Sequence, residues 1–597
     1  MLQSPERTLA KDHEVVQPTT ETSRNVILSW VKTLRRPRML IGLCAVLLLL
    51  YALLWMYRFI VNQLGPFAPL AFVVGGGMLL AFVGPWLVIH YRAPIQRVLM
   101  RCADWLWTRT GADDLFRHLD KRYPRASRFL IARVTHGTGT GLTLTIGFML
   151  AGIVAWFFIE LLIAVASGSP ITGVDRRIIN LVATLRTPGV DAVMLFITFL
   201  GNVQTILVLT LVALIVTLLS RRYEAAVLLV FALLASSLFF SAIKLLVGRP
   251  RPLFENARIV QGGFSFPSGH AVVSATFYGT IAFLLIHALS RESLKVLVGL
   301  IAALLVLAIG ISRIYLGVHY PSDVVAGWVA GVFWLLLVAL AEHVWSPRAR
   351  QPLAPRQRIV MRGGSIVALI GGAIYLVSVY QTVPAPPQSS TAPAASTVIA
   401  ADAVPAIVAQ LPHYTETLLG NPQEPISLLF VGTQDTLERT FRAAGWTKAE
   451  KMSFASVKQV VVVGLTHQSD PAGPVTPSFL AEQPNTLAFN QPVGTTFEQR
   501  HHIRIWRTQV QTSDGQSLWL ATASFDKGFE LASTTFLPTH QIAPDIDNER
   551  DYIVASLQTA RGVAKTAMLQ LVPPEFGHNM SGDPFFTYGK AVMLWLR

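Results

Sequence analysis

The sequence predicts an all-α polytopic membrane protein of about nine transmembrane helices that continues into a C-terminal α+β domain. Three observations support this fold class. First, 52% of the 597 residues are hydrophobic and only 14% are charged, whereas about 25% are charged in an ordinary soluble domain. Second, apolar runs long enough to cross a bilayer recur between positions 39 and 380. Third, residues 406–597 lack such runs and carry short strand and helix patterns instead.

The chain begins with a polar stretch, residues 1–38, that ends in a basic run. This leader is too long and too polar for a cleavable signal peptide, so we expect a cytoplasmic N-terminal arm. The first two apolar runs, within residues 39–90, are expected to form two accessory transmembrane helices. The nine predicted spans are 39–62, 66–90, 139–167, 192–219, 224–248, 270–289, 296–312, 324–345 and 363–380.

Basic loops predict the orientation of these helices, because short cytoplasmic loops are enriched in Lys and Arg. With the N-terminus in the cytoplasm, every cytoplasmic loop is basic; these loops are 91–138, 220–223, 290–295 and 346–362. The exception is loop 249–269, which holds three arginines yet falls on the outer face. Segment 91–138 alternates aromatic and basic residues, so we expect a basic amphipathic helix on the inner leaflet, with a solvated connector as the alternative.

Residues 346–380 supply a basic loop and the ninth helix, which ends on the outer side. The Pro/Ala/Ser-rich segment 381–405 cannot bury a core and is predicted to be an extended linker. It leaves the C-terminal domain, residues 406–597, outside the cytoplasm. The expected elements of that domain are a strand in ISLLFVGT, a helix in DTLERTFRAAGW, a hairpin of HHIRIWRTQV and SLWLATASF around Asp514–Gly515, and a helix in DNERDYIVASLQTARGV.

The net charge of +15 raises the question of a nucleic-acid partner. Residues 406–597 hold 14 Lys/Arg and 17 Asp/Glu, a net charge of −3, so the basic excess lies in the hydrophobic part. There it sits mostly in loops that fix membrane orientation. We therefore expect membrane lipids, and no nucleic acid, as partners. Two cysteines, Cys44 and Cys102, exclude a disulfide framework and a cysteine-rich metal site.

Three polar clusters interrupt the apolar sequence, and the predicted orientation brings all three to the outer face. Ionisable residues beside transmembrane helices usually mark a functional site. The clusters are Lys244-x6-Arg251–Pro252, Pro267–Ser268–Gly269–His270 and Ser312–Arg313-x5-His319-x3-Asp323.

The residue types in these clusters suit a phosphoryl group. Lys244, Arg251 and Arg313 offer charge-assisted donors to several phosphate oxygens. Ser268 and the Gly269 amide stand where a helix begins, and helix N-termini bind anions. Because the three cations supply the charge that a magnesium ion supplies elsewhere, we expect neither a metal nor another cofactor.

The same clusters offer a nucleophile and an acid. His319 and Asp323 are four residues apart and share a face if the eighth helix begins near His319. Asp323 then holds one ring N–H and leaves the other ring nitrogen free to attack phosphorus. His270 is left to protonate the departing oxygen.

The motifs K-x6-RP, PSGH and SR-x5-H-x3-D, complete and in order, resemble those of the type 2 phosphatidic acid phosphatase (PAP2) superfamily. The resemblance covers residues 139–345 and implies a six-helix catalytic core; the stretch 173–202 also looks like the outer segment of the family. It implies that His319 is a phosphohistidine nucleophile oriented by Asp323, and that His270 is the acid that later activates water. It further implies that the phosphate is held by Lys244, Arg251, Ser268, Gly269 and Arg313.

Residues 406–597 resemble the LssY C-terminal domain that is found fused to such phosphatases. The matching stretches include LLFVGTQDTLERTFRAAGW and THQIAPDIDNERDYIV. This second resemblance supplies no known chemistry, so the domain is left open as a contact surface for a protein partner.

Together these features predict a metal-independent lipid phosphatase at the outer face of a bacterial inner membrane. It would cleave a phosphomonoester or the terminal phosphate of a lipid diphosphate. Phosphatidic acid, phosphatidylglycerophosphate, undecaprenyl diphosphate and a lipid A phosphate all remain open as substrates. Three alternatives also remain open: a lipid-to-lipid phosphotransferase, a vanadate haloperoxidase (disfavoured because that class is soluble), and a non-catalytic scaffold that acts through its C-terminal domain.

Two further sets of residues have competing interpretations. Arg249 and Arg251 are either members of the site or interface anchors. In the C-terminal domain, a metal or sugar site competes with a solvated hairpin edge followed by an acidic helix start, which we favour because acidic residues suit a helix N-terminus. Trp506 and Trp519 are expected to pack in the core or across strands. The residues of the candidate metal or sugar site are His501, His502, Trp506, Asp526, His540, Asp545 and Asp547.

Overall fold

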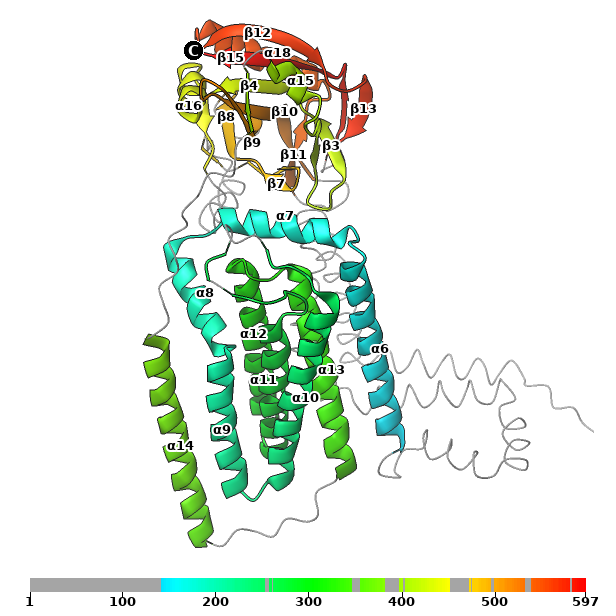
Figure 1. Ribbon diagram of the computed structural model, residues 1–597, viewed down its shortest axis with the longest axis vertical. Helices are drawn as coiled ribbons and strands as arrows, with labels where there is room; N and C mark the ends of the chain where they lie inside the picture. Colours follow the sequence, from blue (N-terminus) through cyan, green and yellow to red (C-terminus); the bar gives the residue numbers. More distant parts are fainter. Residues whose placement is uncertain are drawn as a thin grey trace, which may run out of the picture. The chain divides into compact units, whose positions relative to one another are not determined.

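The structure is a computed structural model. The predicted N-terminal arm, the two accessory helices and segment 91–138 lie outside the described residues, as does most of the predicted linker. The described part holds a helical region up to position 381 and a strand-rich region from position 397 onward (Figure 1). The structure describes residues 141–252, 257–259, 261–345, 355–381, 397–400, 403–450, 472–473, 475–494, 499–531, 538–579 and 582–597.

Long apolar helices dominate the first region. Within the described residues, six helices are long and apolar enough to cross a membrane, and a seventh span results if one bent pair is counted as a single span. The total of nine stays a prediction, because two predicted spans precede the described residues. The six helices are α6 (Gly141–Ala166), α10 (Tyr223–Val247), α11 (Gly269–Ala288), α12 (Glu292–Tyr315), α13 (Pro321–Trp345) and α14 (Pro355–Gln381).

The predicted span at 192–219 is apolar and long enough to cross a membrane only as a bent pair of helices, not as one straight helix. The segment divides into α8 (Pro188–Leu200) and α9 (Val203–Leu219), which meet at 45°. A Cβ atom on Gly201, at the bend, would lie 2.5 Å from Ile309 Cγ2 and 3.3 Å from His270 Cδ2. Glycine at this position therefore lets α12 and the start of α11 approach the bend closely.

Small residues bring α11 and α13 together. A Cβ atom on Gly327 would lie 2.6 Å from Ala271 Cβ, and one on Gly331 would lie 2.3 Å from Ala275 Cβ. Small residues spaced by four positions on both helices allow the close backbone approach that is common between membrane helices. The N-terminal ends of α11 and α13 are thereby held beside each other.

Helix α7 (Ile171–Thr184) differs from the others, because it is amphipathic and runs across the ends of the long helices (Figure 1). It packs against α6, α12 and α13. Its buried residues include two charged ones, Asp175 and Arg177, beside Ile178 and Ile179. A buried charge needs a partner. Asp175 pairs with Arg249, and Arg177 pairs with Glu416.

The strand-rich region is built on a nine-stranded sheet of order β12-β15-β4-β10-β9-β8-β5, with β1 beside β9 and β11 beside β10. Strand β1 lies within the predicted linker, so the sheet begins upstream of position 406. Smaller sheets are formed by β3-β2-β6-β7 and by β13-β14. The strands are β1 (Thr397–Ile399), β2 (Tyr414–Glu416), β3 (Pro422–Pro425), β4 (Leu428–Gly432), β5 (Thr447–Lys448), β6 (Phe479–Leu480), β7 (Gln483–Pro484), β8 (Leu487–Pro492), β9 (Arg500–Thr512), β10 (Ser517–Leu531), β11 (Pro538–Ile542), β12 (Val563–Gln570), β13 (Glu575–His578), β14 (Pro584–Thr587) and β15 (Lys590–Leu596).

Helices cover both faces of the large sheet. Helices α16 (Gln434–Ala443) and α18 (Ile546–Thr559) contribute to the core that contains Trp519, whereas α15 (Val404–Val408) contributes to the core that contains Trp506. The predicted hairpin is confirmed, since β9 and β10 pair antiparallel. Both tryptophans are core residues, as expected. They do not pair across strands, because the register sets Trp506 opposite Leu520.

Candidate active site

The structure brings the three predicted clusters together at the ends of four helices. Lys244 lies in the last turn of α10 and Arg313 in the last turn of α12. Ser268 precedes α11, and Asp323 lies in the first turn of α13. The left-handed conformation of Gly248, with φ of 61°, ends α10 and turns the chain into the arginine-bearing loop.

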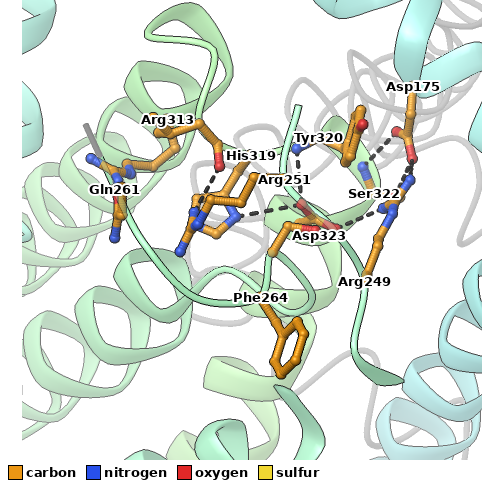
Figure 2. A network of polar contacts seen from close by, with 12 residues as sticks. Asp175, Arg249, Arg251, Gln261, Phe264, Arg313, His319, Tyr320, Ser322 and Asp323 are labelled. Atoms are coloured by element: carbon orange, nitrogen blue, oxygen red, sulfur yellow. Dashed lines mark hydrogen bonds and ion pairs between the residues drawn. The ribbon is translucent and has the colours of Figure 1, made fainter. Parts of the chain in front are cut away.

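His319 and Asp323 form a buried pair, with side-chain exposures of 1% and 0%. The distance from His319 Nδ1 to Asp323 Oδ2 is 3.4 Å, and the Tyr320 amide donates to the same oxygen at 2.9 Å (Figure 2). The two residues do not share a face of one helix, because α13 begins at Pro321 and the condition for a shared face, a helix start near His319, is not met. Proline suits the first helical turn, where its missing N–H leaves no bond unmade, so His319 approaches Asp323 from the preceding loop.

Arg251 decides which nitrogen of His319 carries the proton. Its Nη1 lies 3.1 Å from His319 Nε2, and a guanidinium can only donate. His319 Nε2 must therefore accept, which leaves the proton on Nδ1, the nitrogen that faces Asp323. Burial, reinforced by the nearby charges of Arg313 and Arg251, lowers the pKa of His319 well below its ordinary value. The ring is thus neutral at physiological pH, with its lone pair on Nε2.

The three predicted phosphate-binding cations surround this pair. Lys244 Nζ donates to Phe264 O at 2.6 Å. Arg251 also donates through Nη1 to Val318 O at 2.7 Å. Arg313 Nη1 donates to Thr198 Oγ1 at 2.7 Å, and its Nη2 donates to Gln261. The charges of all three cations act on the His319 ring, and these bonds leave N–H groups of Lys244 and Arg251 for an anion.

The start of α11 adds neutral donors to the same place. Ser268 N donates to Asp323 O at 2.9 Å, which fixes this turn to α13. Ser268 Oγ is buried and has no hydrogen-bond partner among the described residues. A side chain on Gly269 would press against Phe240, at 3.0 Å from its ring. The half-buried ring of His270 lies against the bend at Gly201.

Two residues outside the predicted site belong to the same network. Arg249 donates to Asp323 Oδ1 at 2.7 Å and to Asp175 Oδ2 at 2.7 Å (Figure 2). The interpretation of Arg249 as an interface anchor is wrong, because its side chain is only 10% exposed and bridges two buried carboxylates. Asp175 lies in α7, within the stretch 173–202. The sequence signal for it was its place in this stretch, which resembles the outer segment of the family but assigned no role to a single residue.

The site occurs in a chain with clear relatives. Phosphatidylglycerophosphatase B of Bacillus subtilis (strain 168) is 30% identical over 184 residues, which are 31% of this chain and 90% of that protein. The chain belongs to the PAP2 superfamily. The family model of the PAP2 superfamily matches residues 225–346, and the model of the LssY C-terminus matches residues 408–591. Both predicted resemblances are thereby confirmed.

Other PAP2 relatives match over shorter stretches. The lipid A 1-phosphatase of Rhizobium johnstonii is 35% identical over 19% of this chain and 46% of that protein. The undecaprenyl-diphosphatase of Sulfolobus acidocaldarius is 41% identical over 11% of this chain and 29% of that protein. The crystal structure of the transmembrane PAP2 type phosphatidylglycerolphosphate phosphatase from Bacillus subtilis aligns with 29% identity and a TM-score of 0.31, over 34% of this chain and 98% of that one. The predicted class, a PAP2-type lipid phosphatase with several apolar helices, is confirmed.

The second candidate set, in the LssY-like domain, divides between the two faces of the sheet. His501 bonds to Glu549 at 2.8 Å, whereas His502 faces Asp526 at 3.2 Å. Asp545 caps α18, so the predicted acidic helix start is confirmed. The predicted solvated hairpin edge is wrong for His502 and Asp526, which are 3% and 1% exposed. Among the described residues, no group of three or more His, Cys, Asp or Glu is arranged to hold a metal.

Proposed function

We propose that this PAP2 protein hydrolyses a lipid phosphate at the outer face of the cytoplasmic membrane, without a metal, through a phosphohistidine at His319. The observation that supports this most directly is the environment of the His319 ring. Nδ1–H faces a buried carboxylate, and Nε2 accepts from Arg251. A bound phosphate oxygen can take the place of Nε2 as the acceptor for Arg251, which frees the Nε2 lone pair. A neutral imidazole so held is an activated nucleophile.

In the first step, the phosphate is bound by Lys244, Arg251, Arg313, Ser268 and the Gly269 amide, whose donors stabilise the charge of the transition state. His319 Nε2 attacks phosphorus as the bond between phosphorus and the lipid oxygen breaks. His270 gives its proton to that oxygen, and the dephosphorylated lipid leaves.

In the second step, His270 accepts a proton from water, and the resulting hydroxide attacks the phosphorus of phosphohistidine. The P–N bond breaks, inorganic phosphate leaves, and His319 regains its lone pair. Asp323 stabilises the ring N–H while the imidazole carries positive charge. Every proton and electron pair is thereby returned, so the cycle needs no further reactant.

The substrate we propose first is phosphatidylglycerophosphate, because the relative that is matched over 90% of its length is named for that lipid. Lipid diphosphates and lipid A phosphates, named for the relatives matched over shorter stretches, come second. The outer-face position follows from the basic loops on the opposite side of the predicted helices.

The test is phosphate release by the purified full-length protein in detergent, with EDTA present. The panel contains phosphatidic acid, phosphatidylglycerophosphate, undecaprenyl diphosphate and a lipid A phosphate. We expect release that survives EDTA, is highest with phosphatidylglycerophosphate and is lost in His319→Ala. The matched control is His287→Ala, at the far end of α11, which should retain activity. Loss of lipid phosphate without release of inorganic phosphate would instead identify the phosphotransferase.

A further inference from the structure

The two oxygens of the Asp323 carboxylate have different partners. Oδ2 faces the His319 ring and the Tyr320 amide, whereas Oδ1 accepts from Arg249 Nη1 at 2.7 Å. The same Nη1 donates to Ser322 Oγ at 2.8 Å. Arg249 therefore fixes the rotation of the carboxylate, and with it the direction in which Oδ2 meets the ring (Figure 2).

Asp175 in turn fixes Arg249. Its Oδ2 accepts from Arg249 Nη2 at 2.7 Å, and its Oδ1 accepts from the Ser322 amide at 2.9 Å. The guanidinium also lies over the Tyr320 ring, 4.1 Å from its centroid. Asp175 is 1% exposed, and it meets Asp323 across this single cation. Without Arg249, two buried carboxylates would face each other, and one of them would take up a proton.

We propose that Arg249 and Asp175 are positioning residues for phosphoryl transfer, which keep Asp323 ionised and oriented so that His319 holds its proton on Nδ1. This proposal rests on the proposed function. Neither residue takes part in the phosphate binding proposed above, so their loss should lower kcat and leave KM nearly unchanged. Loss of the partners that orient metal-ligating histidines changes activity about 10-fold to 100-fold, and we expect a fall in kcat of the same size here.

The pH dependence separates this role from a purely structural one. Burial raises the pKa of Asp175 to about 6, so Asp175 is ionised at pH 8 and mostly protonated at pH 5. The charged or titratable groups that face it are Arg249, Asp323, Tyr320 and Arg176. Asp175→Asn imitates the protonated form. The ratio of wild-type to Asp175→Asn kcat should therefore be large at pH 8 and approach one near pH 5.

The experiment compares Arg249→Gln, Arg249→Lys and Asp175→Asn in the full-length protein. Arg249→Lys should recover part of the kcat lost in Arg249→Gln, since it restores the cation. The matched control is Arg258→Gln, which removes another ion pair of the same loop, with Asp191 at 3.3 Å, and should leave kcat within twofold. An unchanged kcat in Arg249→Gln, or a ratio for Asp175→Asn that does not vary with pH, would overturn the proposal.

A second readout does not depend on activity. The ¹⁵N chemical shifts of the His319 ring report its tautomer, which should be Nδ1–H in the wild type and should move toward Nε2–H in Arg249→Gln. If the tautomer changes between the wild type and Arg249→Gln but the wild type releases no phosphate from any lipid, the proposed function fails and the positioning role stands. If the tautomer is the same in both proteins, the positioning role fails.

A separate observation concerns the side of α7 that meets the LssY-like domain. Arg176 makes two bonds to the Glu482 carboxylate, at 2.5 and 2.6 Å. Arg177, which is 7% exposed, donates to Glu416 at 3.0 Å through Nε. Leu418 and Phe479 join Ile178, Ile179 and Leu181 in one buried apolar cluster.

The two contacting turns of the domain have the geometry of a built interface. Glu482, in the β6–β7 turn, has φ of 68°, a conformation that is costly for a residue with a side chain. A Cβ atom on Gly420, between β2 and β3, would lie 2.9 Å from both terminal nitrogens of Arg177. In the β6–β7 turn, the strained residue Glu482 pairs with α7. In the β2–β3 turn, the absence of a side chain at Gly420 leaves room for Arg177.

We infer that the LssY-like domain docks on α7 and thereby holds Asp175, the residue next to these two arginines, in its place beside Arg249. Charge reversal tests this inference. Arg177→Glu and Glu416→Arg should each lower kcat, and the double variant should recover most of the loss. The control pair Glu438–Lys448, 2.7 Å apart within the domain, should leave kcat unchanged on reversal. Wild-type kcat in both single variants, or no recovery in the double variant, would overturn the inference.

Discussion

Replacing Asp323 by Asn tests the role of the carboxylate with almost no change of shape. Arg249 donates to Oδ1 at 2.7 Å, so the amide oxygen of the variant is favoured on that side. The amide NH₂ then points at the Tyr320 amide and at His319 Nδ1, both of which donate in the wild type. His319 can meet this NH₂ only by accepting at Nδ1, which moves its proton to Nε2 and removes the attacking lone pair.

The expected loss follows from that change of tautomer. The corresponding Asp→Asn change in a serine protease triad lowers kcat about 10⁴-fold, and each tenfold equals about 1.36 kcal/mol of barrier. Arg251 opposes the change here, because its Nη1 requires an acceptor at His319 Nε2. We therefore expect a fall in kcat of about 10³-fold to 10⁴-fold, with KM changed less than about threefold because the phosphate-binding donors stay in place.

The assay is steady-state phosphate release from phosphatidylglycerophosphate by wild-type and Asp323→Asn protein, with thermal unfolding measured on both. Asp191→Asn serves as the matched control, since Asp191 is also a buried carboxylate near a helix start, bonded to Tyr315 at 2.8 Å. Equal turnover in Asp323→Asn and the wild type would show that Asp323 does not set the tautomer of His319. A rise in KM at constant kcat would assign Asp323 to substrate binding instead.

Two further predictions concern pH and packing. Because burial and two arginines lower the pKa of His319, the neutral, reactive ring persists below pH 6.5; the acid limb of a bell-shaped kcat/KM profile should therefore lie below that value. An acid limb above pH 7, or a flat profile over pH 5–9 with chemistry rate-limiting, would contradict this. Gly331→Leu should destabilise the protein by about 1–3 kcal/mol, because its Cβ would lie 2.3 Å from Ala275 Cβ. A melting temperature equal to that of Gly152→Leu, where nothing lies within 4 Å, would show that the α11–α13 contact is not tight.

The sequence was sufficient to predict the residues whose spacing is short and local. Ser268, Gly269 and His270 are consecutive, and His319 and Asp323 are separated by three residues. Such spacings limit how far apart the side chains can lie once the flanking apolar runs become helices. Charge in the loops then places all of the clusters at one end of those helices.

Long-range pairing could not be predicted in the same way. Asp175 and Arg249 are 74 positions apart, and no local pattern says which of several arginines a buried aspartate will meet. The bend at Gly201 was missed because its cause is tertiary, namely the close approach of Ile309 and His270. The start of α13 was predicted three residues too late, at position 324, because Pro321 was not recognised as the first helical residue.

In the proposed mechanism the phosphoryl group passes through His319. The most direct measurement is to quench the wild-type protein during turnover of ³²P-labelled phosphatidylglycerophosphate and to locate acid-labile, alkali-stable label by peptide mapping. We predict label on the peptide that contains His319 and none in His319→Ala. Turnover without any protein-bound label, or label on another residue, would contradict a phosphohistidine at His319.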